Sequence, residues 1–131
     1  MANEIQAPDD ARGNAVAFPD CPDTPNCVSS LARDAARRVQ PFPLVGTAPE
    51  SIGRLATIIL SMPRTKVTEK SETFIRAEFR SVLGFVDDVT FMALPGEGIV
   101  HVRSASRTGT WDLGVNRRRV ERIRKRYLER G

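Results

Sequence analysis

A chain of 131 residues that is 40% hydrophobic and 27% charged has the size and composition of one globular domain. Its apolar runs are far shorter than the roughly 18 residues that a membrane-spanning helix requires, so the sequence predicts no transmembrane segment. The formal net charge is +4, but residues 113–131 alone carry seven arginines, one lysine and two glutamates. This basic C-terminal part indicates either an anionic partner or a solvated helix face, and both readings stay open.

The N-terminal part of the chain is polar at first and then rich in proline. Residues 1–18 hold few apolar side chains, and we expect a flexible leader followed by a single domain over residues 19–131. Because the leader has no hydrophobic signal region, the chain as written is expected to be soluble and cytoplasmic. Proline occupies five positions between residues 19 and 43, which predicts an extended coil laid over the domain.

Regular elements are predicted from residue 47 onward. Thr47 and Glu50 have the spacing of a capping box, and the apolar residues behind them repeat at helical intervals, which predicts a helix over residues 48–62. The period then changes to two, as expected for strands that bury one face. The four predicted strands are residues 64–70, 73–81, 88–94 and 98–104.

The last predicted element is a second helix, with Asn116 as its N-cap residue. The short connections between the strands favour hairpins and therefore an antiparallel meander. The predicted fold is α+β: an N-terminal extended Pro-rich segment, a helix, a four-stranded antiparallel meander and a C-terminal helix, with the helices covering one face of the sheet.

Cys21 and Cys27 are the only cysteines of the chain. A disulfide across the five intervening residues is sterically feasible, and two free thiols are the alternative. Together with His101, the single histidine, they cannot supply the four ligands of a structural zinc site, so no metal site is predicted. The phosphate-binding loop pattern is absent as well, and no cofactor is predicted.

The first turn of the last predicted helix carries Arg117, Arg118 and Arg119. Cations at a helix N-terminus oppose the helix dipole, so stability alone would not select them. Guanidinium groups and free N–H groups there favour a site for phosphate or carboxylate. The alternative is that carboxylates of the protein itself already occupy these arginines, which would make the cluster a lock that holds the fold. Asp87, Asp88 and Asp112 are the carboxylates considered for that role.

We therefore predict a non-enzymatic module that binds an anionic small molecule or an acidic protein surface. The candidate ligand-binding residues are Arg103, Ser104, Ser106, Arg107, Asp112, Asn116, Arg117 and Arg119. One alternative is a small hydrolase-like enzyme that uses Asp87 or Asp88 together with Ser104 or Ser106, and another is a ligand-free structural or assembly factor. No aromatic series alternates with the basic residues, so sequence-specific nucleic-acid binding is not expected.

Three stretches of the sequence resemble one known family. CPDTPNCVSS at 21–30, GFVDDVTF at 84–91 and VRSASRTGTWDLGVNRRRVERIR at 102–124 resemble DUF1499, a family of unknown function, and the resemblance extends over about residues 19–128. Its members often follow a signal sequence, a lipoprotein signal or a membrane segment, so the resemblance implies a periplasmic or membrane-associated location as the alternative to the cytoplasm. It implies no activity.

Overall fold

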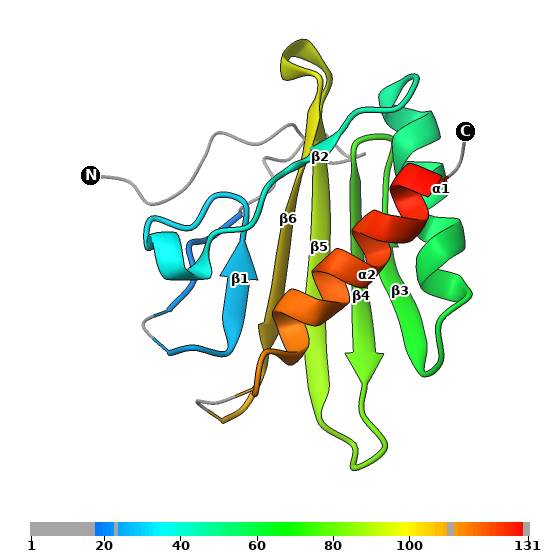
Figure 1. Cartoon of the computed structure of the whole chain (residues 1–131). Helices are drawn as coiled ribbons and strands as arrows, with labels where there is room; N and C mark the ends of the chain where they lie inside the picture. Colours follow the sequence, from blue (N-terminus) through cyan, green and yellow to red (C-terminus); the bar gives the residue numbers. More distant parts are fainter. Residues whose placement is uncertain (1–17, 23, 110–111, 130–131) are drawn as a thin grey trace.

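A computed structural model describes residues 18–22, 24–109 and 112–129 of the chain. Within these ranges, two α-helices lie on one face of a six-stranded antiparallel sheet, which confirms the predicted α+β class (Figure 1). The strands run in the order β1-β6-β5-β4-β3, and β2 also pairs with β6. Their bounds are Cys27–Ser29 (β1), Phe42–Pro43 (β2), Thr65–Lys70 (β3), Phe74–Arg80 (β4), Val86–Leu94 (β5) and Ile99–Ser106 (β6).

The sheet has six strands, two more than the four that were predicted. The meander is confirmed as β3 to β6, but β1 and β2 add two short strands from the Pro-rich segment, which was predicted to be coil. Both pair with the outer edge of β6, with Cys27 opposite Ala105 and Phe42 opposite Val100. An uncovered strand edge exposes unpaired N–H and C=O groups, so these two pairings cover an edge that the meander leaves open.

Helix α1 spans Ala48–Leu60 and begins at the predicted capping box. The Thr47 hydroxyl accepts a hydrogen bond from the Glu50 backbone N–H at 3.2 Å, and the Glu50 carboxylate accepts one from the Thr47 N–H at 2.8 Å. These two bonds satisfy donors that have no partner inside the helix. The helix ends two residues before the predicted position.

Helix α2 spans Val115–Glu129, so Asn116 lies inside its first turn and the N-cap prediction is wrong. The capping oxygens belong to Asp112, whose carboxylate accepts hydrogen bonds from the N–H groups of Gly114 at 2.8 Å and Asn116 at 3.2 Å. Leu113 and Gly114 both have left-handed backbones, with φ of 54° and 79°, and they turn the chain between Asp112 and the helix. A carboxylate is also the charge that a helix N-terminus favours.

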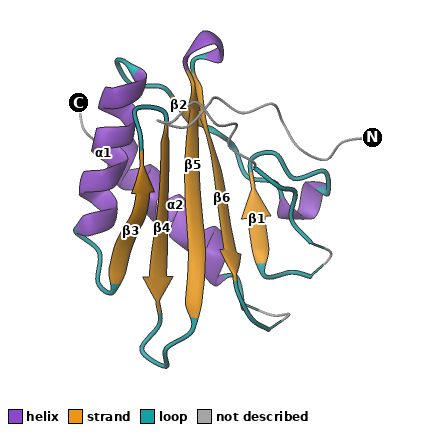
Figure 2. Cartoon of the chain, turned by 180° about the vertical axis from the view of Figure 1, so that it is seen from behind, coloured by secondary structure: helices purple, strands orange, loops and turns teal. Residues whose placement is uncertain are grey.

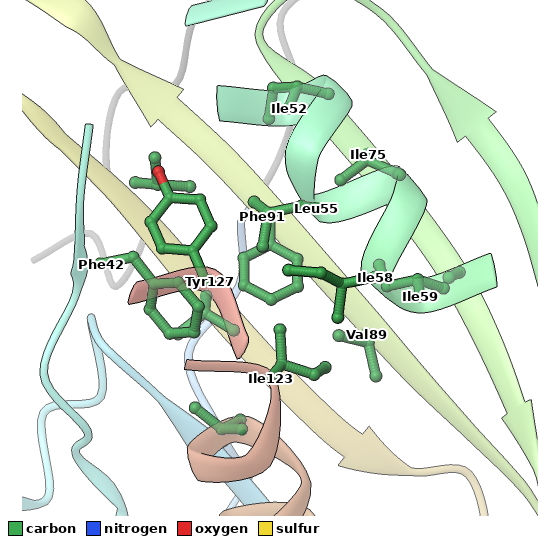
Figure 3. Close-up of a cluster of buried hydrophobic side chains, with 14 of the residues drawn as sticks. Phe42, Ile52, Leu55, Ile58, Ile59, Ile75, Val89, Phe91, Ile123 and Tyr127 are labelled. Atoms are coloured by element: carbon green, nitrogen blue, oxygen red, sulfur yellow. The ribbon is translucent and has the colours of Figure 1, made fainter. Parts of the chain in front are cut away.

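The main hydrophobic core fills the space between the two helices and the sheet (Figure 3). Leu55 of α1 and Tyr127 of α2 are fully buried there against the sheet residue Phe91. Each large apolar side chain removed from water contributes about 1.5–3 kcal/mol before entropy costs. The Tyr127 hydroxyl donates to the carbonyl of Pro43 at 2.7 Å, so the C-terminal helix also fastens the Pro-rich segment.

The opposite face of the sheet carries neither helix (Figure 2). A smaller apolar cluster lies there, in which Phe18 packs with Phe74 and Met92. Phe18 was assigned to the predicted leader, yet it is buried, while the rest of that leader lies outside the described residues. Cys21 and Cys27 form a disulfide with their Cα atoms 5.7 Å apart, which ties the segment after Phe18 to β1.

No helix in the described parts of the chain has the length and apolar character needed to cross a membrane.

Candidate functional site

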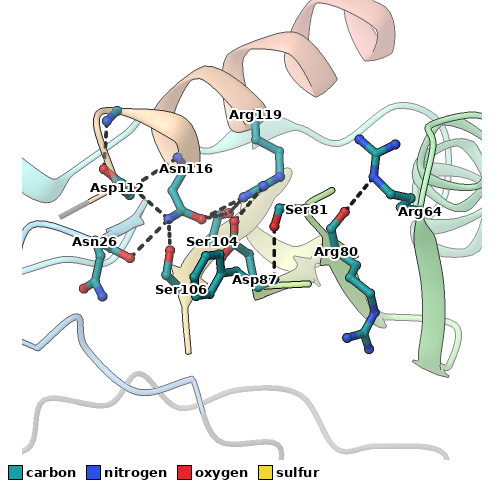
Figure 4. Close-up of polar contacts among 12 residues, drawn as sticks. Asn26, Arg64, Arg80, Ser81, Asp87, Ser104, Ser106, Asp112, Asn116 and Arg119 are labelled. Carbon is teal, nitrogen blue, oxygen red and sulfur yellow. Dashed lines mark hydrogen bonds and ion pairs between the residues drawn. The ribbon is translucent and has the colours of Figure 1, made fainter. Parts of the chain in front are cut away.

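The centre of the candidate site is the side chain of Asn116, which is fully buried beneath the start of α2 (Figure 4). Its oxygen accepts hydrogen bonds from the Ser104 hydroxyl at 2.6 Å and from Arg119 Nη1 at 2.8 Å. Ser104 comes from β6 and is itself fully buried. The amide oxygen therefore joins α2 to β6.

The amide nitrogen of Asn116 has three further partners. It donates to the carbonyl of Asn26 at 3.2 Å, to the Ser106 hydroxyl at 2.9 Å and to Asp112 Oδ2 at 2.8 Å. These partners lie before β1, at the end of β6 and in the loop before α2. The hydrogen-bonding capacity of the amide is thus used within the protein.

Arg119 is the second member of this network. Its Nη2 lies 2.7 Å from Asp87 Oδ2, and the two side chains are only 13% and 12% exposed. Its Nη1 also donates to Ser104 at 3.2 Å, and the guanidinium lies 4.9 Å from the ring centre of Phe79. A buried ion pair of this kind has little charge left for a ligand, and removing one partner would leave the other buried and unpaired.

Arg117 and Arg118 are exposed at the rim of the network, and backbone carbonyls accept their hydrogen bonds. Arg117 donates to the carbonyls of Ala36 at 2.8 Å and Arg38 at 3.4 Å. Arg118 donates to the carbonyl of Leu113 at 2.8 Å. These bonds leave each guanidinium its full positive charge, because a carbonyl is neutral.

Arg107 lies on the opposite face of the sheet from Ser104, Ser106 and Asn116. Its guanidinium bonds to Asp88 at 2.7 and 2.9 Å and to Glu78 at 2.8 Å. The hydrogen bonds that Arg107 donates to Asp88 and, to a lesser extent, to Glu78 raise the pKa of Arg107. Adjacent strand residues point to opposite faces, which is also why Asp88 faces Arg107 while Asp87 faces Arg119.

Arg103 shares the face of Arg107 and is half-buried beneath the segment that follows Phe18. Burial lowers the pKa of Arg103, and the nearby charges of Asp88 and Asp20 oppose that effect. Nη2 reaches the carbonyl of Asp20 at 3.5 Å, whereas the buried Nε finds no acceptor within the described residues. Arg103 is therefore a candidate residue with unused donor capacity.

The predicted site residues thus divide between the two faces of the sheet. Ser104, Ser106, Asp112, Asn116 and Arg119 form the network beneath α2, Arg117 lies at its rim, and Arg103 and Arg107 lie on the other face. Sequence reasoning missed Phe79 as the surface on which Arg119 stacks. The strand alternation that places Phe79 on the core face was the signal that could have indicated it.

A cavity of about 410 Å³ opens beside the network. It is lined by Ser81, Phe85, Asp87, Ser106, Thr108, Gly109, Asp112 and Val115.

Burial alone would raise the pKa of Asp112, but hydrogen bonds from the Asn116 side chain and from backbone N–H groups outweigh it and lower that pKa. The Asp112 carboxylate therefore stays charged and keeps its capping role.

His101 has a structural environment in β6. It is buried, and its Nδ1 lies 2.9 Å from the Ser30 hydroxyl. Burial lowers the pKa of His101, with Glu97 opposing the effect. Among the residues that the structure describes, no cluster of three or more His, Cys, Asp or Glu side chains could hold a metal ion.

A family model described as a protein of unknown function (DUF1499) matches residues 17–127, and the chain therefore belongs to that family. A comparison with curated proteins finds no match.

Proposed function

We propose that this member of the DUF1499 family is a non-enzymatic module that binds an acidic protein surface through the outer side of α2. We call this surface the α2 basic face. Its exposed basic residues are Arg117, Arg118, Arg122, Lys125 and Arg126. Only two exposed acidic residues, Glu121 and Glu129, accompany them on the described part of the helix.

The excess of positive charge on this face is the observation that carries the proposal. Arg122 lies four residues from both Arg118 and Arg126, and like charges at that spacing destabilise a helix. The carboxylate of Glu121 does not neutralise the arginines of the α2 basic face, because it pairs with Arg124 at 2.9 Å. Arg122 and Lys125 have neither a hydrogen bond nor an ion pair to any described residue. Their charge is available to a partner.

An extended acidic surface fits this arrangement better than a small anion does. The basic side chains follow the length of the helix instead of converging on one point. The cavity of about 390 Å³ next to Arg117 is lined by Arg37, Asp34 and Asp112 as well, so its two acidic residues offset its two arginines and leave little net attraction for an anion. The partner favoured by the α2 basic face therefore presents several carboxylates over a similar length.

An anionic small molecule is the second candidate, and one observation favours it at a different place. The Arg103 Nε is a buried donor with no acceptor within the described residues, and an oxyanion would satisfy it. A thermal-shift titration with inorganic phosphate tests this candidate. A shift that is lost in Arg103→Gln would support it, and the absence of any shift would count against it.

We do not propose a reaction for the cavity beside the network. Asp87 and Ser106 share its wall, but the Asp87 carboxylate is paired with Arg119. Ser104 is fully buried, and Asp88 bonds to Arg107 on the other face. A base that must abstract a proton is poorly served by a carboxylate held in a buried ion pair.

Binding of poly-L-glutamate, measured by titration calorimetry at low salt, tests the main proposal. We expect Arg122→Gln/Lys125→Gln to weaken binding about fivefold, since two exposed charge pairs are lost. The matched control, Lys66→Gln/Lys70→Gln, removes the same charge from exposed positions of β3 and is expected to change affinity by less than about twofold. Equal effects of the two variants, or no binding by the wild type, would contradict the proposal.

A further inference from the structure

Five exposed apolar side chains gather at one end of the sheet, in the β4–β5 hairpin and at the start of α2. We call them the apolar tip: Val82, Leu83, Phe85, Leu113 and Val115, which are 80%, 83%, 59%, 80% and 38% exposed. Phe85 and Val115 line the same cavity, which places the hairpin beside the start of α2, whereas Leu113 lines the separate cavity next to Arg117. The hairpin projects beyond the other elements at that end (Figure 1). Contiguous exposed apolar surface of this kind marks a site of contact with protein or membrane.

Part of the backbone of the hairpin turn is hydrogen-bonded within the turn. The N–H groups of Ser81 and Gly84 donate to the carbonyls of Phe85 at 2.8 Å and Ser81 at 3.0 Å. The Phe85 N–H donates to the Ser81 hydroxyl at 3.0 Å. Unpaired backbone groups are what makes a loop costly to move out of water, so these bonds lower the cost of placing the turn in a less polar medium.

Exposed arginines adjoin the apolar tip. Arg80 precedes the hairpin turn, and Arg64 donates to the Arg80 carbonyl at 3.0 Å. The backbone N–H of Arg107 donates to the Val86 carbonyl at 3.1 Å, and the Arg118 guanidinium donates to the Leu113 carbonyl at 2.8 Å. The neighbouring acidic side chains are less exposed and already paired: Glu78 and Asp88 with Arg107, Glu78 also with Arg80 at 3.7 Å, and Asp87 with Arg119. Arg107 is thus neutralised by two carboxylates, whereas Arg64 and Arg118 form no ion pair with a described carboxylate.

We propose that the apolar tip inserts into the interface of an anionic phospholipid bilayer while Arg64, Arg80 and Arg118 contact the headgroups. A projecting apolar turn bordered by cations matches an interface that is apolar inside and negatively charged at its surface. A second copy of the chain is a poorer occupant, because a symmetric contact would place the arginines of one copy against those of the other. This surface shares only Arg118 with the α2 basic face, and the inference does not depend on the proposed function.

Vesicle flotation tests the inference, with phosphatidylcholine vesicles that contain or lack phosphatidylglycerol. We expect the wild-type chain to float with the anionic vesicles, and Leu83→Ser to lower its partition coefficient about tenfold. Leu128→Ser makes the same change at another exposed leucine, near the C-terminal end of α2, and is expected to alter partitioning less than about twofold. Arg64→Gln/Arg80→Gln is expected to weaken binding to the anionic vesicles.

Urea unfolding of each variant checks that these surface changes leave the fold intact. Failure of the wild type to bind anionic vesicles would overturn the inference and favour a protein partner for the tip. Equal loss in Leu83→Ser and Leu128→Ser, or full binding by Leu83→Ser, would overturn it as well. The affinity for poly-L-glutamate should be the same in Leu83→Ser and in the wild type, so failure here is distinguishable from failure of the α2 proposal.

Discussion

The side-chain amide of Asn116 donates a 3.2 Å hydrogen bond to the backbone carbonyl of Asn26, 90 residues earlier in the chain. One buried side chain in the first turn of α2 thus fastens the segment that leads into β1. The same amide also holds β6 through Ser104 and Ser106. The Arg/Ser/Asn motif beneath α2 therefore acts first as a brace between segments that are distant in sequence.

Asn116→Ala should lower the free energy of unfolding by at least about 3 kcal/mol, because several buried donors and acceptors lose their partner at once. Urea unfolding at pH 7 measures this change. Ser106→Ala is the control, since it removes one partner of the same amide and is expected to cost less than about 1.5 kcal/mol. A loss below about 1 kcal/mol in Asn116→Ala would show that the network is not a brace.

A double-mutant cycle should detect strong coupling between Arg119 and Asp87. Arg119→Met and Asp87→Asn each leave a nearly buried group without its partner, and we expect losses of about 3 kcal/mol with a coupling energy above about 1.5 kcal/mol. The more exposed pair of Arg76 and Glu69, whose side chains are 41% and 34% exposed, is the control and should couple by less than about 1 kcal/mol. Equal coupling in the two pairs would contradict the buried role of Arg119.

Reduction of the Cys21–Cys27 disulfide should destabilise the domain by about 2 kcal/mol, since it frees a short loop in the unfolded chain. It also releases the tie between β1 and the segment that carries Phe18. Urea unfolding with and without dithiothreitol measures the effect. Cys21→Ser/Cys27→Ser should match the reduced protein and be insensitive to dithiothreitol, whereas identical midpoints for the oxidised and reduced wild type would contradict the prediction.

Stability should fall in acid partly through Asp112. Its hydrogen bonds lower the pKa in the folded state, so its contribution is complete above the ordinary carboxyl pKa of about 4 and is lost as the pH falls through the lower folded-state value. Asp112→Asn should therefore make the acid limb of the stability profile shallower. Urea unfolding over a series of acidic pH values measures it, and profiles of equal steepness would exclude the role.

Much of the fold could be predicted because it is encoded locally. The capping box at Thr47 and Glu50 and the four strands of the meander depend on neighbours within a few residues, and both are confirmed. The predicted alternation of buried and exposed residues holds in β3 and most of β4, but β5 and β6 are buried on both faces over much of their length. The strands β1 and β2 were missed because they are three and two residues long, and their pairing with β6 depends on contacts far along the chain.

The candidate site was harder to predict for the same physical reason. Sequence alone offered Asp87, Asp88 and Asp112 as partners of the arginines in the first turn, but the pairing of Asp87 with Arg119 is known only once α2 lies across the sheet. The capping role of Asp112 depends on the left-handed backbone at Leu113. Leucine rarely adopts this conformation, so the sequence does not predict it. The division of the arginines between two faces follows from the alternation of side chains along β6, which separates Arg103 and Arg107 from Ser104 and Ser106. The side of the sheet on which α2 lies is known only from the fold.

The most direct test of the account compares two variants in two assays, unfolding in urea and binding to poly-L-glutamate. The account predicts that Arg119→Met loses about 3 kcal/mol of stability while its folded form keeps its affinity within about twofold. We expect the reverse for Arg122→Gln/Lys125→Gln: its free energy of unfolding stays within about 0.5 kcal/mol of the wild-type value, and its affinity for poly-L-glutamate falls about fivefold. An Arg119→Met protein that is fully stable but no longer binds poly-L-glutamate would show that the motif beneath α2 is the binding site and not a brace.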